Sequence, residues 1–319
     1  MSKTGSFVFS LDFELYWGVH HNRPFDTYKD NLLVAARNLP LVAKLFAEHD
    51  ASLTCATVGM LYTQNWNELK NAQPAVKPTY HNSALSPYGK MPDMQATLPP
   101  QVLFAPQILA ELRQGGHEIA THTYSHFFCL EPGANLEAFE DDLKKAREVA
   151  AAQGDNIVSI VFPRNQFATP HLEICKRQGI CVYRGNPSSG LFDKKSNSLS
   201  DLAKRIIRLA DSYLNLTGHN CYELVKDHSG MLNVKASFFL RSPRSMKLPL
   251  LQYLHMHRLK KAMSYAAEKG LVFHLWCHPH NIAAATDIDQ LKEILAHYRV
   301  LKHTYGFESK TMSECLEYT

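Results

Sequence analysis

The chain has 319 residues, 45% of them hydrophobic and 20% charged, and its formal net charge at pH 7 is +4. This composition is typical of a globular protein that can bury a sizeable core. The basic residues form no run of about five or more, so the charge predicts no partner among nucleic acids or anionic membranes. No apolar stretch reaches the roughly 18 residues that predict a transmembrane helix.

The chain start and the cysteines indicate a cellular compartment. Residues 1–6 are small and polar, without the basic end and apolar stretch of a signal peptide, so we expect a cytoplasmic protein. The 7 cysteines are scattered and include no Cys-x-x-Cys pair, which argues against a disulfide framework and a structural zinc site. The chain also contains 17 histidines, several of them in tight groups.

Strand and helix patterns alternate from the start of the chain. The apolar run 7–11 is rich in strand formers, and residues 51–58 have the same character. Between them, residues 31–50 carry apolar side chains at helical spacing, with a bend expected at Pro40. This β-α-β order predicts a parallel sheet or barrel.

Residues 60–105 interrupt the alternation with many prolines among polar residues. No lasting helical or strand period runs through them, so we expect a long insertion and a candidate lid over a site.

The alternation of predicted helices and strands then resumes. The predicted helices are 106–114, 135–153, 170–178, 202–213, 249–269 and 287–301, and the predicted strands are 117–120, 157–162, 181–184 and 271–276. Residues 215–248 show no pattern that assigns them.

Four groups of chemically active residues follow predicted strands: residues 12–14, 122–126, 162–166 and 276–280. In parallel α/β proteins, functional groups collect where the carboxyl ends of strands meet the variable loops. We therefore expect these four groups to meet at one site.

The first group contains two acids, Asp12 and Glu14. Side chains two residues apart on a strand point the same way, so the two carboxylates can share a site. Two adjacent acids without a cation would push one pKa upward, so a metal ion or a basic neighbour is expected. Taken alone, the same pattern also fits an exposed acidic strand end.

His122 and His126 in the second group are four residues apart. If the stretch forms one helical turn, both imidazoles lie on one face, which suits two ligands of a divalent metal. A carboxylate from elsewhere would complete a three-ligand site with an open position for water. The spacing also arises by chance in a chain this rich in histidine, and we interpret the nearby His117 as structural.

The remaining groups contribute a histidine pair and an arginine. Pro279 keeps residue 278 extended, so His278 and His280 can project from the same side, and either is a candidate general acid. Arg164 is a candidate for binding a carboxylate or a substrate oxyanion bidentately. Trp17 and Trp276 are candidate stacking faces for a sugar ring, although packing is the commoner role of such residues.

Together the four groups resemble the motifs of the polysaccharide deacetylase family, also called the NodB-homology family or carbohydrate esterase family four. Residues 10–14, Ser-Leu-Asp-Phe-Glu, resemble its first motif, an apolar strand that ends in paired acids. Residues 122–126 match its His-Ser/Thr-x-x-His motif at every specified position. Pro163-Arg164 resembles the third motif loosely, and residues 275–278 resemble the last. The chain departs from the family pattern in three places. Glu14 stands where Asp is usual, residues 162–166 read Phe-Pro-Arg-Asn-Gln in place of the third motif, Arg-x-Pro-Tyr, and the insertion at residues 60–105 is long.

The resemblance implies one α/β catalytic domain over residues 1–319, an irregular (β/α)7-type barrel. It also implies a role for each of six residues. Glu14, His122 and His126 would bind a metal ion, Asp12 would accept a proton from the attacking water, His278 would protonate the departing amine, and Arg164 would orient Asp12. Zinc is the first expectation for the metal, with cobalt, nickel and manganese open. The sequence alone leaves open whether Asp12 or Glu14 is the ligand.

The implied reaction is removal of an N-acyl group, most often N-acetyl, from a sugar. Because we expect the protein to act inside the cell, we favour a surface-glycan precursor as its substrate. Two alternatives stay open. One is a hydrolase on the same fold that is metal-independent or that cleaves formamides or cyclic amides, and the other is a glycan-binding protein with a degenerate site.

Overall fold

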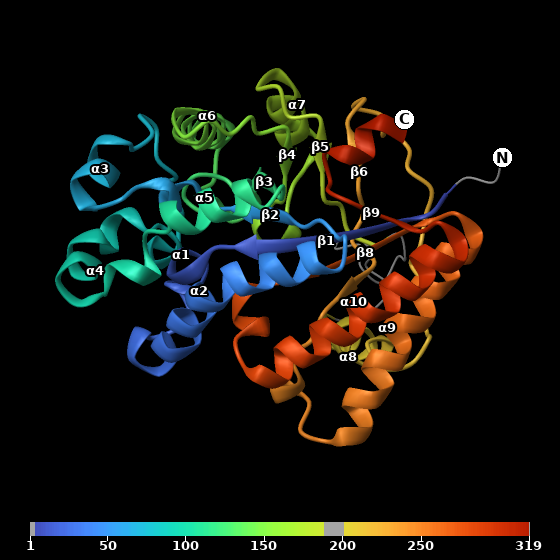
Figure 1. Cartoon of the computed structure of the whole chain (residues 1–319). Helices are drawn as coiled ribbons and strands as arrows, with labels where there is room; N and C mark the ends of the chain where they lie inside the picture. Colours follow the sequence, from blue (N-terminus) through green and yellow to red (C-terminus); the bar gives the residue numbers. More distant parts are fainter. Residues whose placement is uncertain (1–3, 188–200, 319) are drawn as a thin grey trace.

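The computed structural model of the chain describes residues 4–187 and 201–318 (Figure 1). The strands are β1 (Ser6–Phe13), β2 (Thr54–Thr57), β3 (Glu118–Thr121), β4 (Ser159–Ile160), β5 (Val182–Tyr183), β6 (Leu232–Asn233), β7 (Phe238–Phe239), β8 (Val272–Cys277) and β9 (Glu308–Lys310). The α-helices are α1 (Leu15–Val19), α2 (Phe25–Glu48), α3 (Trp66–Asn71), α4 (Met91–Thr97), α5 (Pro106–Gln114), α6 (Leu136–Ala152), α7 (Thr169–Arg177), α8 (Asp201–Asp211), α9 (Pro249–Lys269) and α10 (Ala285–Tyr305).

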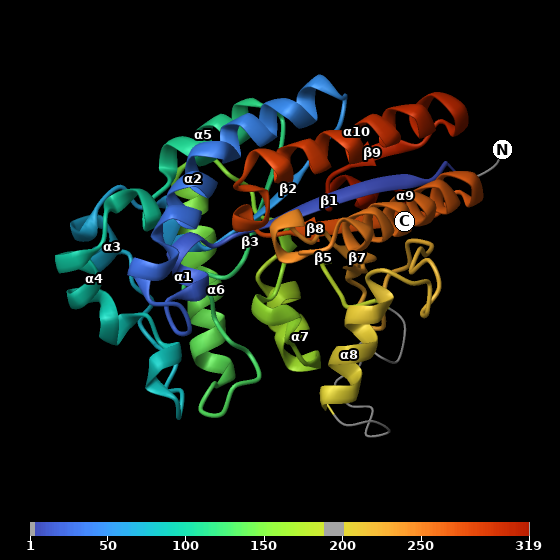
Figure 2. The ribbon, with the colours of Figure 1, turned by 90° about the horizontal axis from the view of Figure 1, so that it is seen from below.

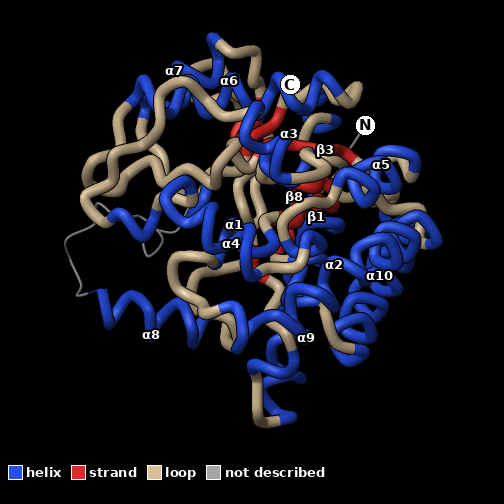
Figure 3. Tube along the Cα trace, turned by 90° about the vertical axis from the view of Figure 1, so that its left-hand side faces the viewer, coloured by secondary structure: helices blue, strands red, loops and turns tan. Residues whose placement is uncertain are grey.

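The named strands pair in parallel, in the order β6-β5-β4-β3-β2-β1-β8-β7. β8 runs along one side of β1, so β9 and β2 share its other side, with β9 on residues 6–8 and β2 on residues 10–13. Figure 2 shows α2, α5 and α10 on one side of the strands and α6, α7 and α8 on the other. Figure 3 shows the strands in the interior, enclosed by helices.

The sheet curls until its two edges approach each other. Its edge strands, β6 and β7, are joined by residues 234–237 alone. The backbone amide of Ala236 donates to the carbonyl of Gly185 beyond β5 (2.9 Å), and that of Ser237 donates to His274 of β8 (2.8 Å). The parallel α/β barrel predicted from the sequence is confirmed, in an incompletely closed form.

Two apolar cores hold the barrel together. Alternate residues of β1, such as Phe7 and Phe9, face outward and pack under the helices. The opposite residues face the barrel interior, where small and branched side chains from successive strands meet: Val8, Ala56, Ala120, Val161, Val182, Leu232 and Val272. Further along β1, the same inward face carries Ser10 and Asp12, so polar groups replace the apolar core toward the carboxyl end of the strands.

Many predicted elements agree with the structure, with differences at their ends. α5 has the predicted bounds, and Asn135 caps α6 by accepting from the backbone amide of Ala138 (2.8 Å). α2 begins earlier than predicted and retains Pro40 within it. The last helix begins at Ala285 and not at Asp287, whose carboxylate accepts from the backbone amide of Ala284 (2.8 Å).

Residues 60–105 form short helical segments, including α3 and α4, which lie near α1 (Figure 1). The indole of Trp17 in α1 donates to the carbonyl of Leu103 (2.8 Å) and packs edge-on against Trp66 (6.5 Å between ring centroids). The segment is therefore joined to the main core, and its role as a lid stays a prediction. Among the helices of the described residues, none combines the length and apolar character needed to cross a membrane.

Candidate active site

Glu14, His122 and His126 meet at the carboxyl end of the barrel. Oε2 of Glu14 lies 3.0 Å from Nε2 of His126 and 3.6 Å from Nε2 of His122. All three side chains are buried, and one ligand atom from each lies within 4.8 Å of the others. The structure thus brings together the three residues that the sequence predicted as metal ligands.

The hydrogen bonds of the two histidines favour a metal ion at this point. Nδ1 of His122 lies 2.7 Å from the carbonyl oxygen of Val161, which can only accept, so Nδ1 carries the proton. When the ring is neutral, Nε2 is the nitrogen with the free lone pair, and it faces Glu14, the arrangement expected of a metal-binding imidazole. Nδ1 of His126 is buried without a partner. Two imidazole nitrogens and a carboxylate form a donor set that fits zinc and related divalent ions.

The loop that carries the two histidines is not a helical turn. Thr123 and His126 have positive φ angles of 64° and 58°, in the left-handed region that residues with side chains seldom occupy. The expected helical face was therefore the wrong explanation of the spacing. The loop folds back on itself instead, and the hydroxyl of Thr123 accepts from the backbone amide of Phe127 (2.7 Å).

The buried carboxylate of Asp142, in α6, stabilises this loop by hydrogen bonds. Its carboxylate accepts from the backbone amide of Tyr124 (2.6 Å) and from both the backbone amide and the hydroxyl of Ser125. Burial raises the pKa of Asp142 to about 6, against the opposing effect of these hydrogen bonds. The carboxylate thereby fixes the residues between the two histidines.

We expect Asp142→Asn to weaken metal binding by about 10-fold or more, because an amide nitrogen cannot accept from the loop donors. Competition with a chelating dye measures the affinity. Glu140→Gln is the control, at a half-buried position on the same helix whose carboxylate pairs with Arg177, and it should bind metal as the native chain does. Native affinity in Asp142→Asn would show that the loop holds its shape without this support.

Gly18 in α1 leaves room for the Glu14 side chain. A Cβ atom at this position would lie 2.0 Å from Cδ and 2.3 Å from Oε2 of Glu14. The backbone of Gly18 needs no positive φ, so the requirement for glycine comes from space alone. Any larger residue must displace the carboxylate.

We therefore expect Gly18→Ala to lower metal affinity by about 10-fold or more while changing the melting temperature little, because the atoms that must move are the flexible end of the Glu14 side chain. Gly89→Ala is the matched control, since its Cβ would meet nothing within 4 Å. A Gly18→Ala protein with native metal affinity would contradict the assignment of Glu14 as a ligand.

Asp12 pairs with Arg184, which follows β5. Nη1 and Nη2 of Arg184 donate to Oδ1 and Oδ2 of Asp12 at 2.6 and 2.7 Å, and the arginine side chain is fully buried. Burial raises the pKa of Asp12, but Arg184, with the nearby His122 and His278, outweighs it and leaves the pKa below its ordinary value. Asp12 is therefore ionised at neutral pH.

Neutral groups complete the surroundings of Arg184. The amide oxygen of Asn165 accepts from its Nη2 (3.0 Å), and the hydroxyl of Ser10 accepts from its Nη1 (2.9 Å). Ser10 in turn lies 2.8 Å from Nε2 of His274, whose Nδ1 lies 3.1 Å from the carbonyl oxygen of Val234. Burial lowers the pKa of His274 to about 3, so its ring is neutral and can accept from Ser10. This chain of hydrogen bonds fixes the guanidinium on Asp12.

The structure places Arg164 at the rim of the site and not on Asp12. Its guanidinium donates to Glu131 (2.5 Å), contacts His21 (2.9 Å) and lies over the ring of Phe128, 4.2 Å from the centroid. The contact predicted for Arg164 is made by Arg184. Arg184 is the last residue of the predicted strand 181–184, and that position was the only signal in the sequence that pointed to it.

His278 lies beside both carboxylates, with Nε2 3.9 Å from Oδ2 of Asp12 and 3.8 Å from Oε1 of Glu14. Burial raises the pKa of Glu14, while His278, His122 and His126 together hold it well below its ordinary value. The ring of His280 stacks on His278 with centroids 4.8 Å apart. Burial lowers the pKa of His280 to about 3, so His280 stays neutral, and His278 is the better candidate for a proton donor.

A family model described as polysaccharide deacetylase matches residues 25–183, a range that contains His122 and His126. A solved structure provisionally named a polysaccharide deacetylase, from Mycobacterium smegmatis, has a TM-score of 0.63 and 14% identity over 100% of this chain and 91% of that chain. Another with a provisional name of polysaccharide deacetylase, from Pseudomonas aeruginosa PAO1, has a TM-score of 0.60 and 11% identity over 98% of this chain and 89% of that chain.

A structure named Puue allantoinase has a TM-score of 0.58 and 10% identity over 98% of this chain and 88% of that chain. A search of curated proteins gives no match. At these identities the structural likeness establishes a shared fold. With the family match, the chain belongs to the polysaccharide deacetylase family, a membership that supports carbohydrate deacetylation as its activity.

Proposed function

We propose that the protein is a metal-dependent hydrolase that removes an N-acyl group, most directly N-acetyl, from a sugar. The observation that carries the proposal is the pairing of two carboxylates with separate partners. Glu14 faces His122 and His126, whereas Asp12 is held by Arg184. In this proposal Glu14 is the acid that binds the metal ion, and Asp12 is the acid that is kept as an ionised base.

A divalent ion at Glu14, His122 and His126, with zinc as our first choice and cobalt, nickel or manganese as alternatives, would supply Lewis acidity and a water molecule of lowered pKa. Asp12 accepts the proton of the attacking water as its oxygen bonds to the acyl carbon. His278 donates a proton to the sugar nitrogen as the carbon–nitrogen bond breaks. The products are an amino sugar and a carboxylate, acetate for an N-acetyl substrate.

The test is release of acetate or formate by protein purified without an affinity tag and loaded with metal. N-acetylated sugars, N-formylated sugars and cyclic amides are assayed side by side, with finished polymer beside soluble glycan precursors. We expect release from an N-acylated sugar, dependent on metal, with precursors preferred to polymer. Hydrolysis of cyclic amides alone, or glycan binding without turnover in the metal-loaded protein, would contradict the proposal.

A further inference from the structure

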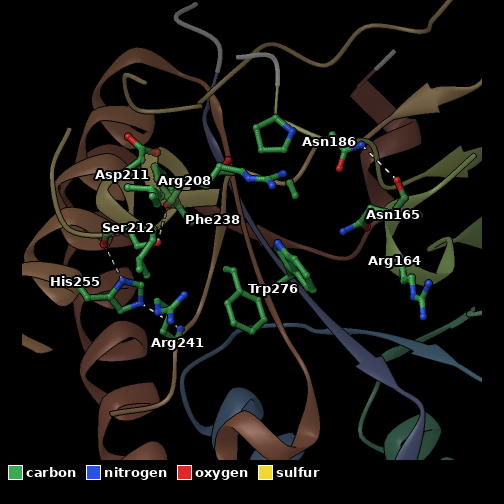
Figure 4. Close-up of a pocket in the computed structure, with 16 residues that line it drawn as sticks. Arg164, Asn165, Asn186, Arg208, Asp211, Ser212, Phe238, Arg241, His255 and Trp276 are labelled. Atoms are coloured by element: carbon green, nitrogen blue, oxygen red, sulfur yellow. Dashed lines mark hydrogen bonds between the residues drawn. The ribbon is translucent and has the colours of Figure 1, made fainter. Parts of the chain in front are cut away.

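A cavity of about 680 Å³ is lined in part by two residues that contact Arg184. Its lining includes Asn165, which accepts from Arg184, and Trp276, whose ring lies 4.2 Å from the guanidinium carbon of Arg184. Figure 4 shows Trp276 between Asn165 and Arg164 on one side and His255 and Arg241 on the other. The cavity therefore shares a wall with the site proposed for the reaction.

The cavity carries excess positive charge. Arg208 of α8 and Arg241, two residues beyond β7, both line it, and neither forms an ion pair with a carboxylate of the described residues. Nε of Arg241 is buried and has no hydrogen-bond partner. Figure 4 shows the side chain of Arg208 reaching toward the middle of the cavity. Two guanidinium groups with free donors are suited to an oxyanion.

The one carboxylate among the described lining residues is Asp211, which is already engaged. It accepts from the backbone amides of Leu216 (3.0 Å) and Thr217 (2.8 Å), and Nη2 of Arg258 lies 3.5 Å from it. Asp211 thus neutralises Arg258 and leaves Arg208 and Arg241 uncompensated.

An aromatic wall connects this charged region to the reaction centre. Phe239 packs on Trp276 with ring centroids 4.7 Å apart, and its centroid lies 5.9 Å from that of His278. Aromatic side chains offer apolar faces on which a sugar ring can lie. A sugar placed on this wall would have its acyl nitrogen near His278 and a second substituent in the cavity.

We propose that Arg208 and Arg241 bind an anionic substituent of the N-acylated sugar, a phosphate or diphosphate ester, while the sugar ring lies against Phe239 and Trp276. The proposal rests on the proposed function, because the sugar must present its acyl group to that site. A sugar carboxylate shares the oxyanion chemistry of a phosphate ester, so the experiment separates the two.

Kinetics with three acylated probes give the first test: N-acetylglucosamine, N-acetylglucosamine 1-phosphate and an N-acetylated uronic acid. We expect a kcat/KM at least about 10-fold higher for the phosphate than for the neutral sugar, since hydrogen bonds to charged groups are the stronger class. Arg208→Gln with Arg241→Gln should raise KM for the phosphate by about 10-fold or more and leave kcat and the neutral sugar little changed. Arg177→Gln, an exposed arginine on α7, is the control.

A higher kcat/KM for the uronic acid than for the phosphate would assign the cavity to carboxylates and overturn the phosphate proposal. Equal kcat/KM for the charged and neutral sugars would overturn the anion site altogether. If the double variant unfolds, the same kinetic comparison is made with Arg208→Gln alone, since Arg208 is half-buried on a helix.

Calorimetry with glucose 1-phosphate, which has no acyl group, tests the cavity without turnover. The chain carrying His122→Ala and His126→Ala is titrated beside the native chain, so that binding of phosphate to a metal ion does not contribute. The inference is supported if glucose 1-phosphate binds to both chains and binds more weakly after Arg208→Gln and Arg241→Gln are added. This support holds even if no sugar is deacylated and the proposed function fails. No binding, or binding unaffected by those substitutions, overturns the inference while deacylation stands.

Discussion

We expect replacement of both His122 and His126 by alanine to reduce bound metal from about one ion per chain to almost none and to abolish deacylation, because two of the three proposed protein ligands are lost. Both rings are buried around Glu14, so the expected loss in rate is at least about 1000-fold. Elemental mass spectrometry of the purified chains measures the metal, and acetate release measures the rate.

The control for this variant removes two histidines that lie at the surface. His257 of α9 and His303 of α10 are exposed. The chain with His257→Ala and His303→Ala should retain its metal and its rate. Full metal content in the His122→Ala, His126→Ala chain would show that the ion binds elsewhere, and an unchanged rate without metal would contradict metal dependence.

We expect replacement of Arg184 by lysine to lower kcat by about 100-fold and to move the acid limb of the pH profile to higher pH. Lysine keeps the charge but loses the planar fork that holds both oxygens of Asp12. The base works only when ionised, so the rate rises with pH as Asp12 loses its proton. Arg184 holds the pKa of Asp12 below its ordinary value, and a weaker partner lets burial raise it.

The same substitution at Arg164 distinguishes the two arginines. Arg164→Lys should cost less than about 3-fold in kcat and leave the acid limb in place, because this guanidinium pairs with Glu131 at the rim. Melting temperatures of both variants show whether each is folded, since loss of one partner of a buried pair costs about 3–5 kcal/mol in stability. A larger loss in Arg164→Lys than in Arg184→Lys would restore the role that the sequence suggested for Arg164.

The sequence predicted the fold where a periodic pattern or a terminating residue was strong. The apolar run of β1 and the cap at Asn135 are local signals, and both appear in the structure. β6, β7 and β9 span only two or three residues each, too few to show a period, and were not predicted. They form because the curled sheet supplies hydrogen-bond partners from strands far away in the chain.

For the site residues too, local sequence signals were sufficient for some positions, and contacts between distant parts of the chain decide the others. The structure brings Asp12, Glu14 and the two histidines together as the short motifs predicted, because strand ends converge in any parallel barrel. The choice of Arg184 over Arg164 depends on which strand end faces Asp12 across the barrel, and the spacing of residues carries no such information. Gly18 left no signal either, since its importance comes from the side chain of Glu14 folded over it.

The central claim is that one metal ion, bound by Glu14, His122 and His126, is required for N-deacylation of a sugar. The measurement that tests it most directly is acetate release as a function of metal added back to the metal-free native chain, with occupancy measured on the same samples. The account predicts that the rate rises in proportion to occupancy and levels off at about one ion per chain. Full activity in the metal-free chain, or no release from any N-acylated sugar at full occupancy, would contradict it.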